Sequence, residues 1–374
     1  MKKVGIITLY NDNDNYGGLA QGMALQQFIE ANGYDCKIIN YRRKQGMLFA
    51  PTRPLKSRIS NAIPARLERI LSKLVIEDIS KRRKAFIESR EGIPHTNEFN
   101  ENTIDDCNAE FDIFVTGSDQ VWRPCVVQDP YVLSFVKNKR KISYASSISQ
   151  TVLSEEYGNY MRRNLSTYNA ISVREIQAKQ YLEGILKSEV EWVCDPVLLL
   201  DREEWLDKCK GVVKQCQKPY VFSYVLGNIR ETRRICNKIA KRKRLTQVVF
   251  PHVEGRFRLA DINWGDEKIF SAGISEFLAL IRDADLIVTD SFHATVFSII
   301  FEKQFFVLPR KNRVEDGDMS SRLTSFLRSA GLENRLILKA GEIDNVTCID
   351  YSNIKNEFYD QIKKSRDWLI WALQ

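Results

Sequence analysis

The chain has 374 residues, of which 44% are hydrophobic and 28% charged, with a mean hydropathy of −0.32 and a formal net charge of +8. This composition excludes a disordered chain, a collagen-like repeat and a disulfide-rich miniprotein, and the length predicts two domains of about 100–200 residues each. No segment approaches the roughly 18 apolar residues of a membrane-spanning helix, so we do not expect an integral membrane protein.

The N-terminus and the cysteine and histidine content predict a cytoplasmic protein without a metal or another cofactor. The apolar run at 4–10 ends at polar residues 11–14 and has no small-residue cleavage site, which indicates a buried strand rather than a signal peptide. The eight cysteines form no Cys-x-x-Cys pair and the three histidines lie far apart. We therefore expect neither disulfides nor a protein-bound transition metal.

Strands and helices alternate along the first half of the chain. An apolar strand at 4–9 is followed by a polar loop, a helix at about 19–32 and a strand at 36–41, which is the pattern of a βαβ unit. Further strands are predicted at 111–116, 141–145, 170–173 and 190–193, with helices at 154–168 and 175–184.

A polar segment at 201–217, with Trp205 as a packing anchor, separates this half from a second alternation. The chain then predicts strands at 220–225, 247–250, 286–289 and 305–308, and helices at 230–244, 275–282, 293–302 and 354–373. We expect an α/β fold of two Rossmann-like domains facing a cleft, with an N-terminal domain at 1–200 and a C-terminal domain at 201–374 that ends in an amphipathic helix.

Residues 53–90 contain eleven basic and four acidic residues, a net charge of +7, with apolar residues at helical spacing. This pattern predicts one or two basic amphipathic helices in the first domain. A solvated helix face explains it most simply. Docking onto an anionic membrane surface or a lipid-diphosphate substrate is the alternative, whereas no recognition motif supports nucleic acid.

The first polar cluster is Asn15-Tyr16-Gly17-Gly18, between the first strand and the first helix. Paired glycines let the backbone approach a ligand, and a helix N-terminus favours negative charge. The spacing is not that of a dinucleotide-binding loop. The cluster is either a substrate loop or a flexible turn.

The second cluster, Ser118-Asp119-Gln120 with Trp122, directly follows a predicted strand. Acidic and amide groups beside an aromatic ring suit a sugar, which presents hydroxyls and an apolar face. The alternative is a capped helix start with the tryptophan in the core.

The third cluster is Ser172-Val173-Arg174-Glu175 at the end of another strand. A guanidinium matches a carboxylate or a phosphate through two parallel N–H bonds. Here it forms either such a receptor or a local ion pair with Glu175.

The fourth cluster places Asp290-Ser291-Phe292-His293 between a buried strand and an apolar helix. A histidine in the first helical turn lies near the positive end of the helix dipole, which suits acid–base chemistry beside an anion. His252, which also follows a strand, is a weaker candidate. After the next strand, further cations for the cleft are available from Arg310, Lys311 and Arg313.

Taken in order, six motifs resemble the polysaccharide pyruvyl transferase family over about residues 4–310. They are Asn-Tyr-Gly-Gly, Gly-Ser-Asp-Gln-Val-Trp, Ser-Tyr-Ala-Ser-Ser, Ser-Val-Arg-Glu, Cys-Asp-Pro-Val-Leu-Leu and Thr-Asp-Ser-Phe-His-Ala-Thr. The resemblance implies a fold of the GT-B type and transfer of the enolpyruvyl group of phosphoenolpyruvate, as co-substrate, to a sugar, usually as a cyclic ketal. The acceptor it implies is a capsule, exopolysaccharide or cell-wall glycan precursor, commonly lipid-linked, with no metal.

The resemblance assigns Arg174 to the carboxylate or phosphate of the donor, His293 to acid–base catalysis, and Asp119 to orienting the acceptor hydroxyl. We expect the acceptor to meet the first two clusters, at Asn15, Tyr16, Gly17, Gly18, Ser118, Gln120 and Trp122.

One position departs from the family pattern. Many relatives have arginine two residues before the histidine, where this chain has Ser291. The second cation for the donor is then expected from Arg310, Lys311 or Arg313. Two alternatives remain: a GT-B-like glycosyltransferase that uses a nucleotide sugar, and a non-catalytic sugar-binding protein on the same fold.

Overall fold

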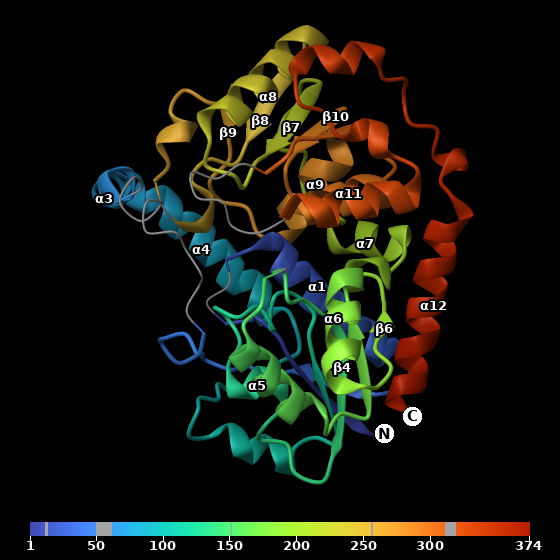
Figure 1. Ribbon diagram of the computed structural model, residues 1–374. Coiled ribbons are helices and arrows are strands. Elements are labelled where there is room, and N and C mark those ends of the chain that lie inside the picture. The colour runs from blue at the N-terminus through green and yellow to red at the C-terminus, as the bar shows by residue number, and fades with distance from the viewer. Residues whose placement is uncertain (12–13, 50–61, 151, 256, 311–318) are drawn as a thin grey trace.

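Short apolar segments form two parallel sheets, as expected for strands that are covered on both faces. The computed structural model describes residues 1–11, 14–49, 62–150, 152–255, 257–310 and 319–374. Each sheet is the centre of one α/β domain (Figure 1), which confirms the predicted fold of two Rossmann-like domains.

The N-terminal sheet has six parallel strands in the order β2-β1-β3-β4-β5-β6. Val4 of β1, the strand next to the edge strand β2, lies opposite Cys36 of β2 and Ile113 of β3. The strands are β1 (Lys3–Ile7), β2 (Asp35–Ile38), β3 (Ile113–Thr116), β4 (Arg140–Ser146), β5 (Ala170–Val173) and β6 (Glu191–Trp192).

The C-terminal sheet has five parallel strands in the order β11-β10-β7-β8-β9. They are β7 (Tyr220–Tyr224), β8 (Thr246–Val249), β9 (Glu267–Lys268), β10 (Leu286–Thr289) and β11 (Phe305–Val307). Because every pair of neighbours is parallel, all carboxyl ends within a sheet point to the same edge, which is where such folds bind ligands.

Every predicted helix is present, with ends shifted by a few residues, and the second half of the chain adds two helices that the sequence did not predict. Those of the first half are α1 (Tyr16–Ala31), α3 (Ala62–Leu71), α4 (Ile76–Glu91), α5 (Glu155–Leu165) and α6 (Ile176–Leu186). Those of the second half are α7 (Arg202–Lys208), α8 (Arg230–Lys243), α9 (Ile274–Asp283), α10 (Phe292–Ile300), α11 (Met319–Ala330) and α12 (Asn356–Leu373). Among the described residues no helix combines the length and apolarity needed to cross a bilayer.

Helix α12 leaves the C-terminal domain and packs along the N-terminal one (Figure 1). Its Ser365 hydroxyl accepts a hydrogen bond of 2.9 Å from the Cys194 backbone N–H, and its Gln361 amide donates one of 2.7 Å to the Trp192 carbonyl. Leu369 and Leu373 are buried in the core beside β1 and β4. The amphipathic helix thus covers the domain opposite to the one it follows.

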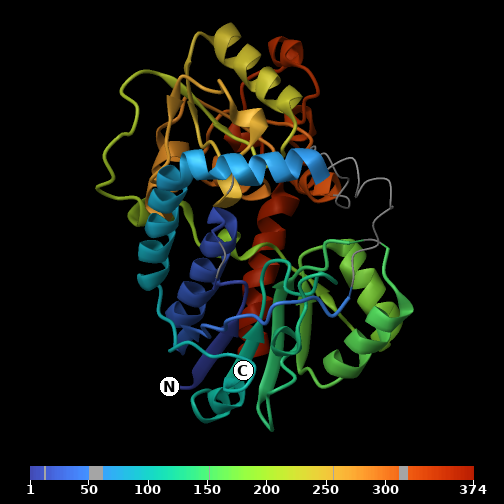
Figure 2. The ribbon, with the colours of Figure 1, turned by 90° about the vertical axis from the view of Figure 1, so that its left-hand side faces the viewer.

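Helices α3 and α4 are placed in the opposite sense. They follow β2 of the N-terminal domain in the chain but pack on the C-terminal domain (Figure 2). The buried guanidinium of Arg82 in α4 donates hydrogen bonds of 2.7 and 2.9 Å to the carbonyls of Pro251 and Ile269. These helices and α12 hold the two domains together from opposite sides.

Candidate functional site

Four polar side chains converge where the two domains meet. Asp119 follows β3, Arg174 follows β5 and Asp195 follows β6, all at the carboxyl edge of the N-terminal sheet. His293 is the second residue of α10 and comes from the C-terminal domain. The convergence follows from the parallel order β3-β4-β5-β6, which brings these strand ends to one edge.

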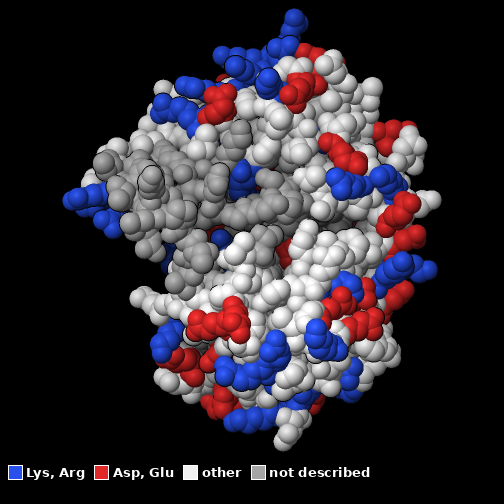
Figure 3. Space-filling view, in the orientation of Figure 1, with Lys and Arg blue, Asp and Glu red and all other residues white. Residues whose placement is uncertain are grey.

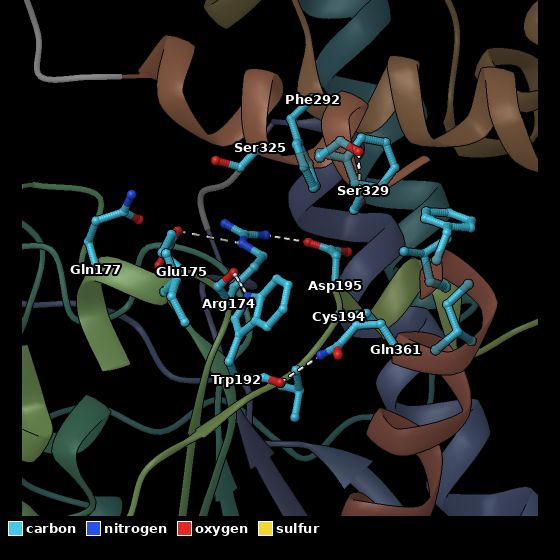
Figure 4. Close-up of a pocket in the computed structure, with 16 residues that line it drawn as sticks. Arg174, Glu175, Gln177, Trp192, Cys194, Asp195, Phe292, Ser325, Ser329 and Gln361 are labelled. Carbon is cyan, nitrogen blue, oxygen red and sulfur yellow. Dashed lines mark hydrogen bonds and ion pairs between the residues drawn. The ribbon is translucent and has the colours of Figure 1, made fainter. Parts of the chain in front are cut away.

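The Arg174 guanidinium lies among three carboxylates. Figure 4 shows two of them, Glu175 and Asp195. Its Nη1 donates a short hydrogen bond to Asp195 Oδ2, Nη2 lies 3.8 Å from Asp119 Oδ1, and Nε lies 3.8 Å from Glu175 Oε1. Nε has no hydrogen-bond partner among the described residues. The local ion pair considered from the sequence is therefore present, and it belongs to a buried cluster of one guanidinium and three carboxylates.

Asp195 connects this arginine to the histidine of the other domain. Its Oδ2 lies 3.5 Å from His293 Nε2, and its Oδ1 accepts a 3.1 Å hydrogen bond from the Val197 N–H. Burial by itself would raise the pKa of Asp195, but the charges of His293 and Arg174 outweigh it and hold the pKa well below its ordinary value. Asp195 is thus an ionised carboxylate that faces the imidazole.

The imidazole of His293 packs directly against the backbone of α1. A Cβ atom at Gly17 would overlap its Nδ1, so only glycine fits at this position. Gly17 and Gly18 donate their backbone N–H groups to the side chain of Asn15, the N-cap of α1. Gly17 therefore provides the close approach between the two domains at the histidine.

A cavity of about 90 Å³ lies between the domains on the other side of Asp195 (Figure 4). Arg174, Asp195 and Trp192 line it from below in this view, and Phe292 lines it from above. It could hold several waters, because one water needs roughly 10–15 Å³ by the same measure, and most of its lining surface is apolar, with Arg174 as a basic group on its wall. His293 is not among the described residues that line the cavity. Asp195 lines it and also contacts His293.

Ser291, the position that departs from the family pattern, caps α10. Its hydroxyl accepts from the Ala294 N–H at 3.4 Å, and its carbonyl accepts from the Thr295 side chain. Arg310, after β11, donates a 3.1 Å hydrogen bond from Nη2 to the Asp290 carbonyl, and its Nε is buried without a partner among the described residues. The Arg310 guanidinium therefore lies beside the residue that precedes Ser291.

Two residues predicted to bind the acceptor are structural, because neither ring is accessible. Trp122 is fully buried and donates from Nε1 to the Tyr131 carbonyl at 2.9 Å, as in the core alternative, although no helix begins there. Tyr16 is 2% exposed, stacks on Phe277 at 4.5 Å and donates its hydroxyl to the Ala272 carbonyl. These positions correct the sequence interpretation.

Ser118 is also buried, and the structure places its hydroxyl against the Ala145 carbonyl at 3.0 Å. This too is a structural contact, which corrects its prediction as an acceptor ligand. Gln120 stays partly exposed beside Asp119, and Asn15 is exposed at the N-terminus of α1. Lys311 and Arg313 lie outside the described residues.

His252, the weaker histidine candidate, is held inside the C-terminal domain. Its Nδ1 accepts from the Arg258 N–H at 3.1 Å, and its ring stacks on Phe257 at 4.9 Å. Burial lowers its pKa, so this imidazole is a neutral packing group.

Sequence reasoning missed Asp195 as a functional residue. It lies within the Cys-Asp-Pro motif, one of the six that carry the family resemblance, and the motif by itself indicates no role for this aspartate. Its position directly after a strand was the available signal, since Asp119 and Arg174 were selected on that basis. Among the described residues, no group of three or more His, Cys, Asp or Glu side chains is arranged to hold a metal ion.

The fold resembles that of sugar-nucleotide epimerases. The UDP-GlcNAc 2-epimerase of Neisseria meningitidis, solved with UDP-GlcNAc, superposes with a TM-score of 0.56 at 11% identity, covering 100% of this chain and 99% of that one. The enzyme from Methanocaldococcus jannaschii gives 0.55 at 14% identity, covering both chains completely. At such identities the likeness shows the fold alone.

No curated protein sequence matches the chain. A sequence model of the family described as polysaccharide pyruvyl transferase, however, matches residues 15–312. That span contains Asp119, Arg174, Asp195 and His293, so the convergent residues lie within the matched region. The chain belongs to the polysaccharide pyruvyl transferase family, a family of transferases.

Proposed function

We propose that this protein transfers the enolpyruvyl group of phosphoenolpyruvate to a sugar of a capsule, exopolysaccharide or cell-wall glycan precursor. The observation that carries the proposal is the contact between His293 Nε2 and the ionised Asp195, at the junction of the domains of a pyruvyl transferase family member. A carboxylate fixed against an imidazole is suited to moving protons between substrates.

The reaction moves two protons. The methylene carbon of phosphoenolpyruvate gains one proton, which makes C2 electrophilic, and a sugar hydroxyl adds to C2. The bond between C2 and the oxygen of the phosphate group then breaks, and phosphate leaves. A second sugar hydroxyl adds to C2 and closes the ketal. One hydroxyl proton ends on the new methyl group and the other on phosphate, so no oxidant or further reactant is needed.

His293 is the proposed acid and base, and Asp195 holds its ring in place. Arg174 positions Asp195 through the Nη1 hydrogen bond. In the proposal it also binds the donor's carboxylate or phosphate from the wall of the interdomain cavity, which it lines. Asp119, 3.8 Å from the same guanidinium, is the proposed group that orients the acceptor hydroxyl.

Arg310 supplies the second donor cation in place of the arginine that Ser291 replaces. Its guanidinium already reaches the Asp290 carbonyl, one residue before that position. Lys311 and Arg313 remain further candidates from the sequence. Gln120 and Asn15 are the acceptor-side residues retained, since Gly17 and Gly18 are buried like Tyr16. We propose that the enzyme acts in the cytoplasm without a resident cofactor.

Calorimetric titration of phosphoenolpyruvate tests the donor without knowledge of the acceptor. We expect saturable binding that Arg174→Ala weakens strongly, while UDP and UDP-GlcNAc give no heat. The structural neighbours named for UDP-GlcNAc make these the appropriate comparison ligands. Nucleotide binding without phosphoenolpyruvate binding would instead favour the nucleotide-sugar glycosyltransferase.

A further inference from the structure

Helix α3 and the 3-10 turn that follows it (Ser72–Val75) expose a row of large apolar side chains. Leu67, Ile70 and Leu74 are 43%, 55% and 77% exposed. Their spacing of three and four residues places them on one face of the helix. Three neighbouring aliphatic side chains left in water are unfavourable unless something covers them.

A basic row runs beside this apolar row. Arg66, Arg69 and Lys73 have the same spacing one residue earlier, are all exposed, and take part in no ion pair with any described residue. One residue is about 100° around a helix, so the two rows are adjacent. Blue side chains extend at the left edge of Figure 3, where α3 lies in Figure 1.

The opposite side of this segment fixes it on the protein. Glu68 accepts a 3.1 Å hydrogen bond from the Leu259 N–H, and the Ser72 hydroxyl accepts one of 2.9 Å from the Phe257 N–H. Both contacts are with the C-terminal domain. The segment therefore cannot turn its apolar row inward without losing them.

The basic residues of this region do not all serve the same purpose. Arg82 is buried and bonded to two carbonyls of the C-terminal domain, so it holds α4 in place. Ile76, the first residue of α4, is also 61% exposed, but it does not continue the spacing of the apolar row. The net charge of the segment thus overstates its free positive surface among the described residues. The part of the predicted basic segment at 53–61 lies outside them.

We propose that this face docks on the surface of an anionic phospholipid membrane. An exposed apolar row beside unpaired Arg and Lys side chains matches a surface of acyl chains under negative headgroups. A protein partner would have to supply an acidic rim around an apolar groove. An anionic bilayer presents negative headgroups and apolar acyl chains along its whole surface. The proposal stands independently of the reaction proposed above.

Docking by this face gives the enzyme access to an acceptor held in the bilayer. In Figure 2, α3 lies across the C-terminal domain just above the N-terminal one, on the side of the interdomain junction. A lipid-linked precursor would then reach the cleft from the surface on which α3 rests.

Vesicle co-sedimentation of the full chain tests the proposal. We expect binding to vesicles of equal parts phosphatidylglycerol and phosphatidylcholine, weaker binding at high salt, and little binding to phosphatidylcholine alone. Arg66→Glu with Arg69→Glu should lower the partition coefficient at least about tenfold. Ile70→Ser with Leu74→Ser should also reduce it, because it removes the buried apolar area.

The matched control is Lys238→Glu with Lys241→Glu, an exposed pair on α8 at the same spacing and with the same change of charge. This control variant should bind the vesicles more strongly than the Arg66/Arg69 variant does. Equal loss in the two charge variants would mean that only net charge matters and would overturn the proposal. So would vesicle binding that the Ile70/Leu74 variant leaves unchanged, or self-association without vesicles that this variant abolishes.

Discussion

His293 Nε2 and Asp195 Oδ2 lie 3.5 Å apart, although the two residues belong to different domains. Asp195 follows the last strand of the N-terminal sheet, and His293 begins the helix after β10 of the other sheet. This contact, the proposed proton-transfer pair, therefore forms only when the domains sit as they do here. Helices α12, α3 and α4, each packed on the domain opposite to its own half of the chain, keep the two domains in that position.

Asp195→Asn should change the acid dependence of folding. In the folded protein the pKa of Asp195 lies below its ordinary value, whereas in the unfolded chain the carboxyl takes up a proton near about 3.9. The unfolded state then binds more protons as pH falls below about 5, so Asp195 loses its stabilising effect there.

Breaking this buried pair should cost roughly 3–5 kcal/mol at pH 7, where the stability gained from the ionised carboxylate is fully present. The difference in free energy of unfolding between wild type and variant should shrink as pH is lowered toward 3. Denaturant unfolding at several pH values measures it. A difference that stays constant with pH would show that Asp195 is not held ionised by its partners.

Gly17→Ala should displace the His293 imidazole, because the added Cβ would occupy the space of Nδ1. The chain has three histidines, so the ring-proton NMR spectrum has few signals to assign. The signal of His293 should move, while those of His95 and His252 should not. Gly184→Ala is the control, since no atom lies within 4 Å of a Cβ there. An unmoved His293 signal would contradict the close approach.

Arg310→Gln should weaken phosphoenolpyruvate binding by about tenfold or more, as expected for the loss of one charged hydrogen bond. The exposed Arg234→Gln on α8 carries the same change of charge away from the site and should leave affinity unaltered. Titration calorimetry compares the two. Equal affinities in both variants would mean that the second donor cation is not Arg310.

Trp122→Phe separates a core role from a sugar-stacking role. It removes the Nε1 hydrogen bond to the Tyr131 carbonyl inside a fully buried site, so we expect a loss of about 1–3 kcal/mol in the free energy of unfolding. Phosphoenolpyruvate affinity should not change. An unchanged free energy of unfolding together with weaker acceptor binding would instead show that the Trp122 ring contacts the acceptor sugar.

The sequence predicts the strands well because both faces of a parallel sheet are apolar. Residues 170–173 and 286–289 form strands with the predicted ends, since polar residues follow each run at once. Two helices, α7 and α11, were not predicted as helices. Helix α7 is mostly charged around a single anchor, Trp205, and a lone buried ring gives no periodic pattern.

The site was predictable only in part, because contacts between domains leave no local pattern. His293, Arg174 and Asp119 were found from their places at strand ends, and they do converge. The roles of Asp195 and of Gly17 depend on a residue of the opposite domain. The sequence motif around Trp122 looked the same whether its ring faced a ligand or the core, and packing alone decides between them.

Product analysis with phosphoenolpyruvate labelled with ¹³C at C2 tests the central claim most directly. The enzyme would be incubated with a lipid-linked glycan fraction, and the glycan examined by NMR, with His293→Gln as the control. The account predicts a labelled ketal carbon bearing a methyl group, inorganic phosphate released in equal amount, and neither product with the variant. Glycan that stays unlabelled while a nucleotide sugar is consumed and nucleoside diphosphate released would contradict it.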